Sequence, residues 1–195
     1  MLAAIVLAAG KSDRMGRPKA LLLFRGKTFL ENILDVISRS PVQQTVVVTG
    51  HHRREIEEAF LQPGYAAIVF NPDYEKGMIT SFQTGIRALA PEAAAAFLFL
   101  VDHPVVEAAT IEALAAKAGQ DRIVVPTFQG SRGHPVLFGT GILKEILELD
   151  PSQGANVVVR KDPGRVVEVP VASQGILIDV DTPEDFDRLS RSPHG

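Results

Sequence analysis

The amino-acid sequence predicts an α/β protein in three α/β/α layers, with a mostly parallel β-sheet and helices on both of its faces. One observation is that short apolar runs rich in β-branched residues alternate with segments of helical spacing along the 195 residues. The other is that turn residues bound each apolar run, as they bound buried strands. In sheets of this class ligands bind just beyond the carboxyl ends of the strands. We therefore expect the functional residues in the loops that follow the strands.

Five apolar runs are the candidate strands of this sheet. The first, at residues 5–7, lies in an apolar N-terminal segment that lacks a basic start and is too short to span a bilayer. We interpret it as a buried strand. The other candidates are the runs 46–48, 67–70, 97–101 and 123–125.

Candidate helices lie between these runs, where apolar residues recur at the spacing of one helix face. These residues are Phe29, Ile33, Leu34 and Ile37; Ile56 and Phe60; Ile79, Phe82, Ile86 and Leu89; Ile111 and Leu114. After Pro126 the pattern is less regular, with a Gly-rich stretch at 130–141, a helix near 142–149, and extended runs near 166–169 and 176–178. We expect one domain over residues 1–190 and a disordered tail at 191–195.

Composition limits the classes of function. Hydrophobic residues make up 46% of the chain and charged residues 22%, as in an ordinary globular protein. The chain has no cysteine, so any metal must be held by oxygen or imidazole. The lack of cysteine is also compatible with a reducing compartment, and we expect a cytoplasmic location. A formal net charge of −3 argues against binding to nucleic acid or an anionic membrane. We expect a small-molecule partner.

The densest chemical pattern is the loop at residues 7–19, Leu-Ala-Ala-Gly-Lys-Ser-Asp-Arg-Met-Gly-Arg-Pro-Lys, directly after the first strand. Glycine lets backbone N–H groups surround phosphate oxygens, while Arg14 and Lys19 can neutralise their charge. A P-loop is excluded because Ile5 stands where that motif needs a glycine, and a dinucleotide fingerprint because Ser12 replaces its second glycine. The loop predicts phosphate binding of another kind; a surface turn with scattered basic residues is the alternative.

This loop resembles the Leu-Ala-Ala-Gly-x-Ser-x-Arg-Met-Gly-x-x-Lys signature of the molybdenum cofactor cytidylyltransferases and guanylyltransferases, and every fixed position is present. The resemblance continues in order through residues 77–81, 101–104, 133–136 and 179–185, and so covers nearly the whole chain. It implies a Rossmann-like nucleotidyltransferase fold. It also implies a magnesium-dependent transfer of a nucleoside monophosphate from a nucleoside triphosphate to the molybdenum cofactor, with release of pyrophosphate.

The resemblance implies nucleotide contacts at Leu7, Ala8, Ala9, Gly10, Ser12, Arg14, Lys19, Gly77 and Ser81, with Arg14, Lys19 and Asp102 as catalytic residues. Within the group, Ala9 accompanies pyrimidine users and glycine at that position accompanies guanine users, so CTP is the expected substrate. The methyl group narrows the space that a purine would need. Ser81 also fits a helix cap, so its role as a base contact stays open.

Two acidic segments contain candidate magnesium ligands. Asp102 follows a strongly apolar run, where a buried carboxylate needs a cation or donors, although it could also cap a following helix. Asp179 and Asp181 share one face of an extended segment before the expected helix start at Pro183, and the alternative is that they only favour that helix. The resemblance implies a second magnesium ligand here, with Asp181 favoured over Asp179.

The acceptor side is less sharply defined. The segment Gly133-His134-Pro135 resembles the family segment that faces the acceptor, and Arg132 could meet a terminal phosphate, although a simple hairpin turn also fits. At residues 51–54, His-His-Arg-Arg, adjacent histidines point in different directions, which favours a solvated helix start over a metal site.

Two departures from the family pattern leave the acceptor open. Many related cytidylyltransferases have the tripeptide Asp-Gln-Pro, whereas this chain has His103 in place of the glutamine. Asn156 stands in place of an arginine that could contact phosphate. The alternatives are a related transferase that uses GTP or another phosphorylated acceptor, and a non-enzymatic carrier that delivers the cofactor to a molybdenum enzyme. A nicotinamide-dependent oxidoreductase lacks support because the glycine fingerprint is missing.

Overall fold

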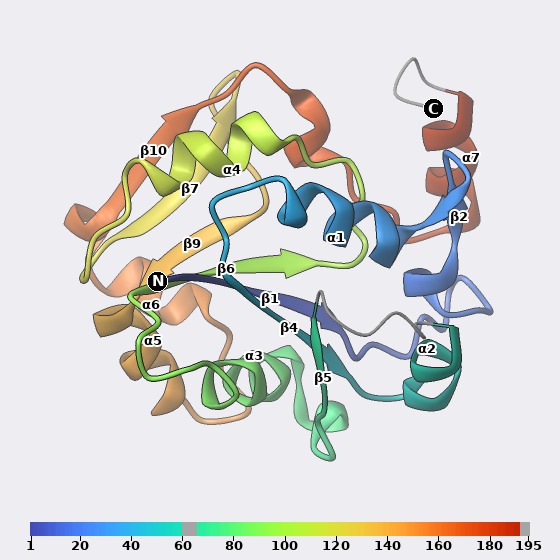
Figure 1. Cartoon of the computed structure of the whole chain (residues 1–195), viewed down its shortest axis with the longest axis horizontal. Coiled ribbons are helices and arrows are strands. Elements are labelled where there is room, and N and C mark those ends of the chain that lie inside the picture. Colours follow the sequence, from blue (N-terminus) through green and yellow to red (C-terminus); the bar gives the residue numbers. More distant parts are fainter. Residues whose placement is uncertain (60–65, 192–195) are drawn as a thin grey trace.

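The structure, a computed structural model, describes residues 1–59 and 66–191. At its centre is an eight-stranded sheet in the order β10-β7-β9-β6-β1-β4-β5, with β8 paired to β7 (Figure 1). The strands are β1 (Leu2–Ala8), β4 (Gln44–Thr49), β5 (Ala67–Phe70), β6 (Ala95–Leu100), β7 (Ile123–Phe128), β8 (Ser131–Arg132), β9 (Val136–Gly139) and β10 (Val166–Pro170). Strands β8 and β9 pair antiparallel with their neighbours, and the other strand pairs of this sheet are parallel. The predicted mostly parallel sheet is confirmed.

Helices cover both faces of the sheet (Figure 1). They are α1 (Phe29–Ser38), α2 (Arg53–Ala59), α3 (Met78–Arg87), α4 (Ala108–Ala115), α5 (Thr140–Leu147), α6 (Asn156–Lys161) and α7 (Pro183–Arg191). Alternate residues of the central strand β1 point to opposite faces. Ile5 therefore packs with Phe82 of α3, whereas Val6 packs with Ile33 of α1. These two apolar clusters are the core between the three layers.

A third, smaller cluster lies beside the end of the first loop. The short strands β2 (Leu23–Phe24) and β3 (Lys27–Thr28) form a hairpin there, and α7 packs near it (Figure 1). Its buried members are Leu22, Phe24, Phe29, Val105, Val180 and Leu189. This cluster brings the C-terminal helix and the segment before it next to the loop that follows β1.

One element differs from its prediction. The run near 176–178 is not extended: residues Gln174–Leu177 form a short 3-10 helix, η4, in which the Ser173 hydroxyl accepts a hydrogen bond from the Gly175 amide. Gly175 packs against the Val105 carbonyl so closely that a Cβ would collide with it. This tertiary contact favours the tight turn over a strand, and the expected extended run was wrong.

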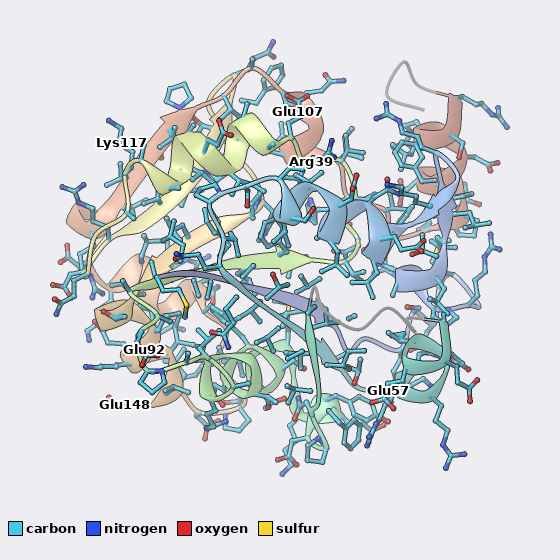
Figure 2. The ribbon with its side chains drawn as sticks, viewed as in Figure 1. Arg39, Glu57, Glu92, Glu107, Lys117 and Glu148 are labelled. Atoms are coloured by element: carbon cyan, nitrogen blue, oxygen red, sulfur yellow. The ribbon has the colours of Figure 1, made fainter. Side chains whose placement is uncertain are left out.

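The remaining boundaries are close to expectation. Helix α7 continues to Arg191, and residues 192–195 of the expected tail lie outside the described residues, as does Phe60. Figure 2 shows charged side chains such as Arg39, Glu92 and Lys117 on the outside of the layers. Among the helices of the described residues, none is long and apolar enough to cross a membrane.

Candidate active site

A cavity of about 470 Å³ lies beyond the carboxyl ends of β1 and β6. That volume falls in the range of small-molecule sites. Of the residues expected from the sequence, it is lined by Leu7, Ala8, Ala9, Gly10, Ser12, Arg14, Lys19, Ser81, Asp102 and Asp181. The loop after β1 and the two acidic segments, far apart in the sequence, therefore meet in one place, at the edge of the sheet where ligands of parallel sheets bind.

The first loop is closed by its own serine. Ser12 has a positive φ of 55°, and its carbonyl accepts hydrogen bonds from the amides of Met15 and Gly16. Its hydroxyl accepts a third from the Lys19 amide at 3.1 Å. Ser12 thus ties the start of the loop to Lys19, which explains why a serine stands where a dinucleotide fingerprint would have glycine.

The start of α2 also holds the loop from outside, and this contact was not predicted from the sequence. His52 Nε2 lies 2.8 Å from the Lys11 carbonyl oxygen, and His52 Nδ1 lies 2.5 Å from a Glu55 carboxylate oxygen. The His52 side chain is 17% exposed and lines the cavity. Helix α2 does begin in the expected segment, but the expectation that the segment is simply solvated was wrong for His52.

A glycine permits this close approach. Gly50 follows β4, and a Cβ there would lie 2.5 Å from the Ala9 carbonyl oxygen and 2.8 Å from the ring of Tyr74. The amide of the next residue, His51, donates to the same Ala9 carbonyl at 3.2 Å. A glycine directly after a strand was the available sequence signal for a close backbone contact at this point.

The cationic and acidic residues form one network. Lys19 Nζ lies 3.3 Å from Asp102 Oδ2 and 2.5 Å from Asp181 Oδ1, while Arg14 reaches Asp181 Oδ2 at 2.6 Å. The Lys19 side chain is only 12% exposed. The hydrogen bond from Lys19, together with the charges of Lys19 and Arg14, holds the pKa of Asp181 below its usual value, although partial burial acts in the opposite direction. Asp181 is therefore an anion at neutral pH.

The backbone fixes the spacing of these acids. The Val180 amide donates to the Asp102 carbonyl at 3.0 Å, and the Val180 side chain is buried in the third cluster. The two acidic segments are thus joined directly, between Asp102 and the residue flanked by Asp179 and Asp181.

Helix capping does not explain the acids. The N-cap of α4 is Glu107 (Figure 2), five residues after Asp102. At α7, Asp185 Oδ2 accepts from the amides of Asp181 and Thr182, while Thr182 Oγ1 accepts from the Asp185 amide. This reciprocal cap leaves the carboxylates of Asp179 and Asp181 free for other contacts.

Ser81 and Gly77 differ in their relation to the cavity. The N-cap of α3 is Gly77, without a side-chain cap, and Ser81 Oγ accepts a hydrogen bond from Asn71 Nδ2 at 2.9 Å. Ser81 is therefore a buried, cavity-lining residue and not a cap. Gly77 has a φ of 125°, which favours glycine, and it does not belong to the cavity lining.

On the far side of Asp102, two histidines pack together. The rings of His103 and His134 have centroids 4.8 Å apart. Burial lowers the pKa of His103, and burial followed by the proximity of His103 lowers the pKa of His134 to about 4. The His134 amide donates to the Ile176 carbonyl of η4, which holds this segment near the acids. Both rings are therefore neutral at neutral pH.

Arg132 is not brought to the cavity. It lies on β8, where its guanidinium is 2.7 Å from Glu168 Oε1 of the edge strand β10. The short β7–β8 connection turns its side chain to that outer edge, whereas His134, two residues later, approaches His103. The expected acceptor pair Arg132 and His134 is thus divided, and only His134 lies next to the candidate site.

The chain is similar to known proteins over most of its length. Residues 4–166 match the family model described as MobA-like NTP transferase domain. The molybdenum cofactor cytidylyltransferase of Escherichia coli strain K12 is 30% identical, with 93% of this chain and 92% of that protein covered. The nicotine blue oxidoreductase of Paenarthrobacter nicotinovorans is also 30% identical, with 95% and 94% covered.

A solved structure shares nearly the entire fold. The crystal structure of Rv0371c from Mycobacterium tuberculosis H37Rv covers 98% of both chains with a TM-score of 0.86 and 28% identity, and that protein was also solved in complex with manganese. Relatives named as cytidylyltransferases and as guanylyltransferases of the molybdenum cofactor both match the chain. The chain belongs to the family of MobA-like NTP transferase domains.

Proposed function

We propose that this protein transfers CMP from CTP to the terminal phosphate of the molybdenum cofactor. The observation that carries the proposal is the network at the cavity, in which Lys19 contacts both Asp102 and Asp181 beside the signature loop. The E. coli cytidylyltransferase, similar over nearly its full length, supports the same reaction. We expect the reaction to take place in the cytoplasm.

The reaction joins two phosphates and needs no nucleophile from the protein. An oxygen of the acceptor phosphate attacks the α-phosphorus of CTP, the bond from the α-phosphorus to the bridging oxygen breaks, and pyrophosphate leaves with the electron pair. Arg14, Lys19 and the amides of the first loop stabilise the negative charge that builds up on the phosphates. The acceptor phosphate is already ionised at neutral pH, so a general base is unnecessary.

The acidic residues fit a divalent cation. Carboxylate oxygens are the ligands that Mg²⁺ prefers, and Asp102 Oδ1 is shielded from solvent without a hydrogen-bond partner among the described residues. Asp102 and Asp181 would hold the ion, and when bound it would supply charge neutralisation at the triphosphate. The relative solved with manganese supports metal binding in proteins of this shape. We propose Mg²⁺ as the physiological ion.

Ala9 supports the choice of CTP over GTP. It is buried at the end of β1, and its carbonyl is in contact with the segment at Gly50, so the loop cannot easily withdraw to admit a purine. A difference of one methyl group in a pocket changes selectivity by about 10 to 200-fold. Ala9→Gly should therefore raise the relative use of GTP by about 10-fold or more.

The test is pyrophosphate release from CTP and from GTP in separate reactions, with Mg²⁺ and purified molybdenum cofactor. We expect release that requires CTP, metal and acceptor together. Asp102→Asn should abolish turnover while the fold is retained, whereas Asp187→Asn, an exposed acid of α7, is the matched control. Release with GTP alone would contradict the base assignment, and near-normal activity of Asp102→Asn would contradict the metal assignment.

The alternatives have their own readouts. If neither nucleotide releases pyrophosphate, the same assay with other phosphorylated acceptors tests a related transferase. Tight cofactor binding without turnover would favour a carrier. The match to an oxidoreductase is tested by NADH binding, which we expect to be absent because Ser12 closes the first loop where a dinucleotide fingerprint has glycine.

A further inference from the structure

A buried asparagine contacts the wall of the nucleotide cavity from within the protein. Asn71 follows β5, and its backbone amide donates to the carbonyl of Thr49, the last residue of β4, at 2.9 Å. The Asn71 side chain contacts Thr80 and Ser81, which lie near the start of α3. Asn71 and Ser81 are each 2% exposed. Asn71 thus connects the carboxyl end of the sheet to a residue that lines the cavity.

The hydrogen bonds of Asn71 fix which atom of its side-chain amide faces the helix. Asn71 Oδ1 accepts from the Asp73 amide at 3.0 Å, and a backbone N–H can pair only with the oxygen of that group. Nδ2 therefore faces α3, where it donates to Thr80 Oγ1 and to Ser81 Oγ, each at 2.9 Å. Both protons of Nδ2 are used in these two bonds. Exchange of the oxygen and nitrogen positions would break all three contacts.

The two hydroxyl groups differ in where their own proton goes. Thr80 Oγ1 donates within the protein, because the carbonyl oxygens of Asp73 and Gly77 lie 2.9 and 2.8 Å from it. Ser81 Oγ accepts from Asn71, and its own proton forms no hydrogen bond with any residue in the described part of the chain. A hydroxyl carries one O–H donor. Because Ser81 lines the cavity, a bound ligand can receive this donor.

The wall around Ser81 suits the base of a nucleotide better than its phosphates. Tyr74 and Glu75 of η2 (Tyr74–Lys76) and Met78 of α3 line the same cavity. The tyrosine ring and the thioether offer the apolar surface on which a flat base can pack. Glu75 pairs with Lys11 at 2.8 Å, which leaves no surplus of positive charge beside these residues. The other cations that line the cavity belong to the network with the acidic segments.

We propose that Asn71 is a positioning residue that holds the Ser81 hydroxyl as a hydrogen-bond donor toward an acceptor atom on the base of the bound nucleotide. The inference rests on the proposed function and names the kind of atom that this wall of the site requires. In cytosine that atom is the carbonyl oxygen O2 or the ring nitrogen N3. The amino group of the base does not fit here, because it would leave the serine proton buried without an acceptor.

Asn71→Asp tests the direction of this hydrogen bond, because it keeps the shape of the side chain and removes both protons of Nδ2. The Asp73 amide and the two hydroxyls favour the ionised form of the new carboxylate, which only accepts hydrogen bonds. Ser81 would then donate to the carboxylate and present only lone pairs to the base. The dissociation constant of the nucleotide, measured by calorimetry with Mg²⁺ and without acceptor, should rise by about 10-fold.

The matched control is Asn32→Asp, the same exchange at another amide. Asn32 Nδ2 donates to the carbonyls of Phe24 and Thr28 in the β2–β3 hairpin, and Asn32 does not line the cavity. This variant should leave the dissociation constant unchanged. An unchanged dissociation constant in Asn71→Asp as well would overturn the proposal.

A double-mutant cycle separates positioning from a general structural effect. Ser81→Ala removes the donor and should raise the dissociation constant by about 5 to 10-fold, and Asn71→Asp should add nothing further in that background. Effects that multiply in the double variant would overturn the positioning role. Tripolyphosphate, which has no base, is the second ligand, and its affinity should be the same in all variants. An equal loss for tripolyphosphate would show that the contact is to phosphate and would also overturn the proposal.

Thermal melting identifies a variant that fails to fold. In that case Asn71→Ala, which introduces no charge, takes the place of Asn71→Asp in the same cycle, and its loss of about 3-fold should again require Ser81. Whichever of CTP and GTP binds the wild-type protein more tightly is the probe, since both bases carry acceptor atoms. A preference for GTP or a failure of the transfer step would contradict the proposed function and leave this test in place. Binding of neither nucleotide would overturn both.

Discussion

Replacing Lys19 by methionine removes one charge from the centre of the candidate site and keeps the apolar stem of the side chain. In the wild-type protein the ammonium contacts both Asp102 and Asp181, and the side chain is 12% exposed. The variant leaves Arg14 as the cation that pairs with Asp181. Two carboxylates then face each other with less compensation, so the folded state loses stability.

The magnitude follows from the two contacts. A hydrogen bond to a charged group contributes about 1.5–3 kcal/mol net, but the buried ammonium also carries a desolvation cost. We therefore expect the free energy of unfolding to fall by about 2 kcal/mol at pH 7. Lys27→Met is the control, because the ion pair from Lys27 to Asp35 is exposed and such pairs contribute about 0–1 kcal/mol.

The sign of the pH dependence follows from Asp181. Its folded-state pKa is lowered, chiefly by Lys19, so its contribution to stability is present above the ordinary aspartate pKa of about 3.9 and is lost as pH falls through the lowered value. The stability difference between wild type and Lys19→Met should therefore shrink in that acidic range. Urea unfolding followed by circular dichroism, with a metal chelator present, measures it. A difference that stays constant from neutral to acidic pH would refute the reasoning.

Three further predictions concern the surroundings of the site. His52→Ala removes the contact with the Lys11 carbonyl and should raise KM for the nucleotide about 5 to 10-fold with little change in kcat. His51→Ala should leave KM unchanged. Steady-state kinetics measures both variants, and an equal effect on KM would contradict the idea that His52 positions the first loop. Gly50→Ala should destabilise the fold by about 1–3 kcal/mol because the new Cβ meets the Ala9 carbonyl. Gly10→Ala has open space around its Cβ position and should leave the melting temperature nearly unchanged. Equal melting temperatures of the two variants would contradict this prediction. Asp185→Ala removes the acceptor for the amides of Asp181 and Thr182 and should cost about 1 kcal/mol in urea unfolding, against no change for the exposed Asp187→Ala.

The sheet and the first loop were predictable because their signals are local. The runs at 5–7 and 46–48 are apolar and β-branched, and they became the adjacent strands β1 and β4. A carboxylate at Asp102, directly after such a run, could be placed at the edge of the sheet before its partner was known. The acidic pair Asp179 and Asp181 could also be recognised in the sequence. Its proximity to Asp102 was expected only from the resemblance, because residues far apart in the sequence give no information on their distance in space.

The features that sequence reasoning missed depend on contacts between distant segments. His52 belongs to a polar helix start, and only the packing of α2 against the first loop gives it a role. The run at 176–178 is apolar enough for a strand, yet Gly175 fits beneath Val105 and the backbone turns instead. Arg132 was assigned by its proximity in sequence to His134, and the pairing of β8 with β7 turned it toward Glu168.

The third apolar cluster explains how the first loop and the two acidic segments can keep one geometry. Val180 is fully buried, and its amide holds the Asp102 carbonyl, so the separation of Asp179 and Asp181 from Asp102 is set by backbone and core contacts. The arrangement of these carboxylates therefore does not depend on Lys19, which binds between carboxylates that are already in place. Because α7 contributes Leu189 to the same cluster, the C-terminal helix supports the acidic site at a distance. Damage to this cluster should then lower metal binding at a smaller loss of stability than damage to the central sheet, because the two larger cores consist of other buried residues.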